Sequence, residues 1–179
     1  VDEGKITAYG VSVETVDEAL EAISHPALAS VQIIFNPFRM KPLDQVLPAA
    51  SKAGVGVIAR VPLASGLLSG KYTADTVFAA DDHRNFNRHG EAFDQGETFA
   101  GVDYQSGVEA AAQFSSLAPV GATPAQTALR WIIQQPGITT VIPGARNAKQ
   151  VLANAAAADL PPLDEPTLAQ IRKLYDSAI

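Results

Sequence analysis

The sequence lacks cysteine and contains no long apolar run. Without cysteine there is no disulfide, no thiolate nucleophile and no cysteine-ligated metal, which fits the reducing cytoplasm in which we expect this protein. No apolar stretch approaches the roughly 18 residues that a membrane span needs, and the first residues show no signal-peptide pattern. Charged residues make up 18% of the chain and hydrophobic residues 47%, a balance that excludes a disordered protein.

Positive charge is also scarce. The 13 Lys and Arg residues against 19 Asp and Glu give a net charge of −6, which argues against nucleic acid or an anionic membrane as the main partner. A local basic pocket for one small phosphate stays compatible with this charge. A length of 179 residues predicts a single domain over 1–179. Because the chain begins at Val1 instead of Met, we expect it to be a piece of a longer protein.

Short β-branched segments alternate with helical patterns along the chain. Each short segment is nearly continuous in apolar character, which is typical of strands buried on both faces. The predicted strands are Ile6–Val11, Val31–Phe35, Val55–Val61 and Ile138–Ile142. The predicted helices are 15–24, 43–53, one that starts at Pro124 after the N-cap Thr123, 147–157 and 164–176. Strands alternating with helices predict an α/β fold with a parallel sheet.

A polar insert, residues 62–101, follows the third predicted strand. It is too long to be a simple connector, and loops of this length are usually lids or binding loops. The chain has three histidines, His83 and His89 in the insert and His25 before a proline, and none of them has metal-ligand spacing. We interpret all three histidines as surface residues and expect no metal site.

Two segments that follow strands are typical of anion sites. Gly144 and Arg146 come after the last strand and precede a helix, whose free N–H groups and positive dipole end favour a phosphate. Gln150 and Asn154 are four residues apart on one face of that helix. The alternative is a plain turn with a solvated arginine.

The second such segment is 61–71, which holds two glycines, two serines and Lys71 beyond the carboxyl end of a strand. It lacks the spacing of a P-loop, and the alternative is a flexible loop on the rim. Ser12 and Gln32, at the ends of the first two strands, are neutral groups suited to fixing a carboxamide.

Taken together, the ordered segments resemble the second half of an aldo-keto reductase over essentially the whole chain. The segments that carry the resemblance are GKITAYGVS, VQIIFNPF, GVIARVPLASGLLSGKY, DDHRNFNRHG and TPAQTALRWIIQQPGITTVIPGARN. The resemblance implies the C-terminal half of a (β/α)8 TIM barrel, strands five to eight with outer helices, that binds NADP(H) at the carboxyl ends of its strands. It also implies an oxidoreductase that reduces aldehydes and ketones without a metal.

The resemblance further implies which residues contact the cofactor. Those at the nicotinamide are Ser12, Gln32 and Arg60, where Arg60 replaces the aromatic residue usual in the family. Those at the pyrophosphate are Val61, Pro62, Leu63, Ala64, Ser65 and Lys71. Those at the 2′-phosphate and adenine are Gly144, Arg146, Gln150 and Asn154. Val13 and Ala153 depart from the family, which often has Asn and an acidic residue at these positions.

The catalytic residues of the family lie in the half that this chain does not contain. The family's catalytic Tyr follows an Asp by five residues, and Tyr9, Tyr72, Tyr104 and Tyr175 all lack that Asp. We therefore expect no catalytic residue on this chain and no activity from it alone.

A half barrel has unpaired edge strands, which need the N-terminal half of the barrel or another subunit as a partner. We also expect its inner face, formed by Ile6, Val31, Ile33, Val57 and Ala59, to be an exposed apolar patch. The alternative function is a non-catalytic nucleotide-binding or structural half barrel that assembles with a partner.

Overall fold

A computed structural model describes residues 1–179 and shows four parallel strands in the order β1-β2-β3-β4. The strands are β1 (Tyr9–Ser12), β2 (Leu28–Ile34), β3 (Gly56–Arg60) and β4 (Thr140–Val141). The helices are α1 (Val16–Ile23), α2 (Lys41–Ala53), α3 (His83–Phe86), α4 (Tyr104–Ser116), α5 (Pro124–Ile133), α6 (Ala148–Ala155) and α7 (Glu165–Ala178). Short 3₁₀ turns are η1 (Ala64–Ser69), η2 (Gln95–Glu97), η3 (Phe99–Gly101) and η4 (Ala156–Asp159). The predicted α/β alternation is therefore confirmed.

Local signals in the sequence explain where the helices begin. Thr15 and Thr123 each form a capping box, in which the threonine side chain accepts from the N3 amide and the N3 side chain accepts from the cap amide. Gly54 ends α2 in the left-handed conformation, which a glycine adopts without strain. These caps keep α1, α2 and α5 close to their predicted bounds.

The two edge strands are shorter than predicted. β1 starts at Tyr9, and Ile6, which the sequence placed in this strand, is 52% exposed outside it. β4 contains only Thr140 and Val141. Both strands pair on one side only, so fewer hydrogen bonds hold their ends in extended conformation.

The predicted assignment of the two sheet faces was wrong. Val31, Ile33, Val57 and Ala59 are fully buried in one apolar cluster with side chains of α1 and α2, so they form the helix-covered face. The opposite face carries Ser12, Gln32, Ile58 and Thr140 in register, and it is partly exposed. Successive side chains of a strand point to opposite faces, and here only one of those faces is apolar. The open face is thus largely polar.

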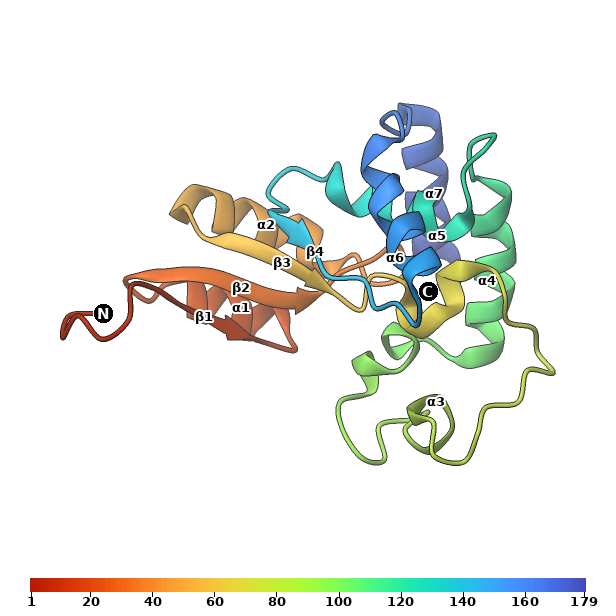
Figure 1. Cartoon of the computed structure of the whole chain (residues 1–179), viewed down its shortest axis with the longest axis horizontal. Coiled ribbons are helices and arrows are strands. Elements are labelled where there is room, and N and C mark those ends of the chain that lie inside the picture. Colours follow the sequence, from red (N-terminus) through yellow and green to blue (C-terminus); the bar gives the residue numbers. More distant parts are fainter.

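The insert is folded, and it meets the sheet where Glu97 pairs with Arg60 at the end of β3. In Figure 1 the sheet lies to the left of helices α4, α5, α6 and α7, and the insert with α3 lies below them. Within the insert, Phe78, Phe99 and Tyr104 pack against one another, with ring centroids 4.9 to 5.8 Å apart. Residues 72–104 thus contribute a group of packed aromatic rings that is continuous with the main apolar core. None of the helices combines the length and the hydropathy that a bilayer crossing requires.

Candidate phosphate and carboxamide site

The carboxyl ends of β1 and β2 bring Ser12 and Gln32 together, as the sequence predicted. The two residues are direct partners in the parallel register, and the Gln32 amide donates to the Ser12 hydroxyl over 3.1 Å. Gln32 retains an amide oxygen and Ser12 a hydroxyl hydrogen, so the pair offers one acceptor and one donor to a carboxamide. This pairing is the expected geometry for recognising an uncharged polar group.

Arg60, at the end of β3, is 7% exposed and is held between two carboxylates. Its guanidinium donates to Glu14 over 2.7 Å, to the Val13 carbonyl over 3.1 Å and to Glu97. These bonds join the end of β1 to the end of the insert. They use the edges of the guanidinium, whereas stacking on a nicotinamide would use its face, so the stacking role of Arg60 stays a prediction.

The segment after β3 adopts an unusual backbone. Val61, Ala64 and Ser65 have φ values of 49°, 47° and 53°, in the left-handed region that costs about 1 kcal/mol or more for a residue with a Cβ. Asn36, fully buried after β2, donates from its amide to the Val61 carbonyl over 2.9 Å. Ser65 donates its hydroxyl to the Glu97 carbonyl over 2.9 Å and accepts from the Phe99 amide over 3.1 Å. Neighbouring elements therefore hold the strained backbone in place.

Three backbone amides of this segment have no hydrogen-bond acceptor within the chain. They are the N–H groups of Val61, Leu63 and Ser65, whereas Ala64 donates to the Val61 carbonyl. Successive amides in a left-handed turn form a concave anion site. The Ser65 hydroxyl itself is fully used, so any contact of Ser65 with a phosphate would come from its main chain.

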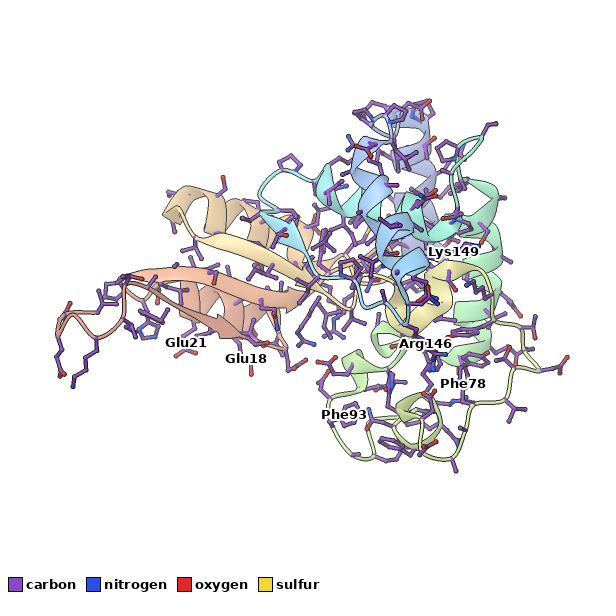
Figure 2. All side chains as sticks on the ribbon, viewed as in Figure 1. Glu18, Glu21, Phe78, Phe93, Arg146 and Lys149 are labelled. Atoms are coloured by element: carbon purple, nitrogen blue, oxygen red, sulfur yellow. The ribbon has the colours of Figure 1, made fainter.

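The turn between β4 and α6 has the second predicted anion site. Arg146 is exposed, and its guanidinium forms no hydrogen bond or ion pair, while Lys149 is the second residue of α6 (Figure 2). The amides of Ala148 and Lys149 open α6 and have no intrahelical acceptor. A free guanidinium beside free helix amides fits a phosphate monoester.

Gln150 and Asn154 bind the turn itself in this structure. The Gln150 side chain accepts from the Arg146 amide over 2.7 Å, and the Asn154 side chain donates to the Gly144 carbonyl over 3.3 Å. Both were predicted to reach an adenine. The structure places them beside Gly144 and Arg146, as predicted, and shows a further role in holding the turn.

Lys71 is the one predicted residue that the structure does not bring to the strand ends. It follows Gly70, which lies against Ser115 of α4 and Pro124 of α5, at the opposite end of η1 from Ser65. Lys71 is exposed and unpaired. Its predicted contact with a pyrophosphate therefore depends on the reach of its side chain across η1.

Several residues of the site were missed by reasoning from the sequence. Glu14 and Glu97 pair with Arg60, Asn36 holds Val61, and Arg84 contacts the carbonyl of Ser65. One signal was available: six of the twelve aromatic residues of the chain lie between Tyr72 and Tyr104. Such a concentration predicts a local core and not a flexible loop.

An open hollow of about 530 Å³ lies beside the Arg60 network. Its lining is mostly acidic and comprises Glu14, His83, Phe93, Asp94 and Glu97. The hollow is bounded by the end of β1 and by the insert, next to the Ser12 end of the site.

Comparisons with known proteins identify the family of this chain. The family model described as the aldo/keto reductase family matches residues 1–176. The aldo-keto reductase str7 of Strobilurus tenacellus is 29% identical over 182 residues, which cover 99% of this chain and 51% of that protein. The aldo-keto reductase yakc of Schizosaccharomyces pombe, named with NADP(+), is 24% identical with the same coverage.

The comparison with solved structures also matches this chain to about half of a longer protein. The glycerol dehydrogenase AKR11B4 of Gluconobacter oxydans superposes with a TM-score of 0.76 at 25% identity, covering 99% of this chain and 51% of that one. The chain thus spans about half the length of the relatives that it matches, and its four-stranded sheet corresponds to half of their barrel. It belongs to the aldo/keto reductase family.

Proposed function

We propose that this chain is the NADP(H)-binding half of an aldo-keto reductase-type oxidoreductase that reduces aldehydes and ketones. The observation that carries the proposal is the unpaired Arg146 guanidinium beside the open amides of α6. The free amides of Leu63 and Ser65 follow β3, and the Ser12–Gln32 pair joins the last residue of β1 to β2 near its carboxyl end. Carboxyl ends of parallel strands meet at one edge, where α/β barrels bind their ligands.

Each group fits one part of the dinucleotide. Ser12 and Gln32 would hold the carboxamide, with Arg60 against the nicotinamide ring. The segment Val61, Pro62, Leu63, Ala64 and Ser65 would bind the pyrophosphate through its amides, with Lys71 as countercharge. Gly144 and Arg146 would take the 2′-phosphate, with Gln150 and Asn154 toward the adenine. This assignment is supported by the name of one relative, the aldo-keto reductase yakc, which includes NADP(+) and of which this chain covers 51%.

The contribution of this chain to the reaction would be orientation. Bound NADPH supplies a hydride to the carbonyl carbon of the substrate, and a proton donor must then neutralise the oxygen. Among the tyrosines, Tyr9 donates to the Pro26 carbonyl over 2.8 Å, Tyr104 donates to the Thr73 carbonyl over 2.9 Å and Tyr72 pairs with Arg84. These three hydroxyls serve the fold. The fourth tyrosine, Tyr175, makes no such bond, but it lies on α7 and lacks the Asp that precedes the family's catalytic Tyr by five residues. We therefore place the proton donor in the other half of the barrel.

That other half is the partner that we propose. β1 and β4 are the two free edges of the sheet, and the face between them is open and polar. Edge strands with unpaired N–H and C=O groups are templates for further pairing. The complement would supply the remaining strands of the barrel, either as the N-terminal half of a longer protein or as another subunit. A cytoplasmic location stays a prediction.

A second candidate function is a half barrel that binds nucleotide or supports an assembly without catalysis. The engaged tyrosine hydroxyls and the open sheet edges favour it. A carbonyl-reductase assay on the 179-residue chain, with and without the complementary half, separates the two functions. We expect turnover only when both halves are present. Turnover by the chain alone would show that its proton donor is among the residues described above.

Titration with NADPH and NADH tests the cofactor assignment. We expect NADPH to bind more tightly than NADH, and Arg146→Ala to weaken NADPH about 10- to 150-fold, as for loss of a charge-assisted bond. NADH affinity should not change. Lys52→Ala is the matched control, because Lys52 is an exposed cation in the last turn of α2, which precedes β3 and so lies at the end of the sheet opposite to the proposed site. No NADPH binding at hundreds of micromolar, or an equal loss for both cofactors, would contradict the proposal.

A further inference from the structure

We propose that Arg84 is a positioning residue, which fixes the pyrophosphate-binding segment 61–65 through an arginine–aromatic cluster in the insert. The cluster consists of Tyr72, Phe78, Arg84, Phe99 and Tyr104. This inference rests on the proposed NADP(H) binding and adds a residue that lies outside the predicted cofactor contacts.

The surroundings of Arg84 hold its guanidinium in one position. The residue is 8% exposed, and its guanidinium carbon lies 4.7 Å from the ring centroid of Phe78 and 5.5 Å from that of Tyr72. Its Nε donates to Asp82 over 2.8 Å, and its Nη2 pairs with the second oxygen of the same carboxylate. A planar fork that is stacked on rings and bound by two edges has little freedom.

The third nitrogen of this guanidinium faces the pyrophosphate-binding segment. The Nη1 atom lies 3.5 Å from the Ser65 carbonyl and also pairs with the Tyr72 hydroxyl. The Tyr72 ring in turn lies against Gly66, where an added Cβ would be 2.7 Å from the Tyr72 hydroxyl. Gly66 has a φ of +102°, so both the space and the backbone require glycine there. Arg84 thus contacts Ser65, and Tyr72 contacts Gly66, on the same side of the segment as the cluster.

The same cluster holds Ser65 from its other side. Phe99, whose amide donates to the Ser65 hydroxyl, packs with its ring 5.8 Å from Phe78 and 4.9 Å from Tyr104. Ser65 is therefore bracketed between Arg84 and Phe99. Because the left-handed backbone of Ser65 is strained, loss of the contact with Arg84 or with Phe99 would let the segment relax. The free amides of Leu63 and Ser65 would then leave the positions that this structure gives them.

Arg88, which lies against the same cluster, provides a matched comparison. Its guanidinium carbon lies 4.7 Å from the ring centroid of Tyr104 and 5.9 Å from that of Phe78. Its one hydrogen bond runs from Nε to the Arg84 carbonyl over 3.2 Å. Arg88 thus shares the stacking of Arg84 without a hydrogen bond to Ser65, Tyr72 or Asp82.

The test compares two ligands on the 179-residue chain and its variants. NADPH needs both phosphate regions, whereas 2′-AMP contains the 2′-phosphate and adenosine and has no phosphate at the 5′ position, where the pyrophosphate of NADPH is attached. We expect Arg84→Met to weaken NADPH about tenfold and to leave the affinity for 2′-AMP unchanged. Arg84→Lys should behave in the same way, because Lys keeps the charge and loses the planar fork. Arg88→Met should bind both ligands like the wild type.

Each other outcome overturns the assignment. Equal weakening of both ligands by Arg84→Met, checked with Arg84→Lys, would make Arg84 a residue of general stability. Unchanged NADPH affinity would show that it does not position the segment, and an equal loss in Arg88→Met would assign the effect to the cluster as a whole. If the wild type binds neither ligand, the proposed function itself fails, and this role of Arg84 fails with it.

Discussion

The two regions proposed to bind phosphate are built in opposite ways. The segment after β3 has a strained backbone and is held by the buried side chain of Asn36, which follows β2, and by main-chain groups of the insert. The turn before α6 is exposed, and two amide side chains of its own helix hold it. The first region is fixed by contacts distant in sequence, and the second by contacts within ten residues.

This difference separates two ways of recognising an anion. Main-chain amides carry no net charge, so they bind a phosphate well only when neighbouring structure fixes their direction. A guanidinium carries a full charge on a flexible side chain that can adjust to the ligand, so it needs few contacts with neighbouring residues to bind a phosphate. We therefore expect mutations around the pyrophosphate-binding segment to affect stability, and mutations at Arg146 to affect binding alone.

Phe99→Ala should have the largest effect on the free energy of unfolding. The Phe99 ring is fully buried between Phe78 and Tyr104, and its loss should cost about 3–5 kcal/mol. Urea unfolding of the variant measures this loss. Phe93→Ala is the control, because Phe93 is an exposed phenylalanine of the same insert. Equal losses in the two variants would show that the insert has no ordered core.

Asp82→Asn should have an intermediate effect that depends on pH. The hydrogen bond from Arg84 lowers the pKa of Asp82 from the ordinary value of 3.8 to about 2. A carboxyl whose pKa is lower in the folded state stabilises the fold above the unfolded pKa, and the gain is lost as the pH falls through the folded pKa.

The stability difference between the wild type and Asp82→Asn should thus be constant above about pH 4 and decrease toward pH 2. Urea unfolding at a series of pH values measures it. A difference that does not change over this range would show that the Asp82–Arg84 pair contributes nothing to stability.

Gln150→Ala should have the smallest effect on stability. The Gln150 side chain makes one hydrogen bond to the exposed Arg146 amide, and water can replace it. We expect a loss of less than about 1 kcal/mol in urea unfolding. A loss as large as that of Phe99→Ala would mean that the turn before α6 is as firmly built into the fold as the insert.

Local patterns predicted the elements of the fold well. The alternation of β-branched and amphipathic segments predicted four parallel strands, and capping residues such as Thr15 and Thr123 predicted where helices begin. The half barrel followed from the resemblance of the whole ordered set of segments. The prediction of which sheet face the helices cover was wrong. Nearly continuous apolar strands do not reveal on which face the helices pack.

In the candidate site, too, the features that depend on local patterns could be predicted, and those that depend on distant contacts could not. The Ser12–Gln32 pair and the Arg146 turn depend on strand ends and a helix start, which a sequence reveals. The bracket around Ser65 depends on contacts with Arg84 and Phe99, 19 and 34 residues away, which follow no periodic pattern. Such contacts between distant residues emerge only when the chain has folded.

Hydrogen exchange with and without NADPH tests the central claim most directly, because it reports on both regions in one measurement. We predict that NADPH protects the amides of residues 61–66 and those of residues 146–150 in the same titration, and that NADH protects the second region less. Unchanged exchange in both regions at saturating NADPH would contradict the claim that this chain binds the dinucleotide by its phosphates.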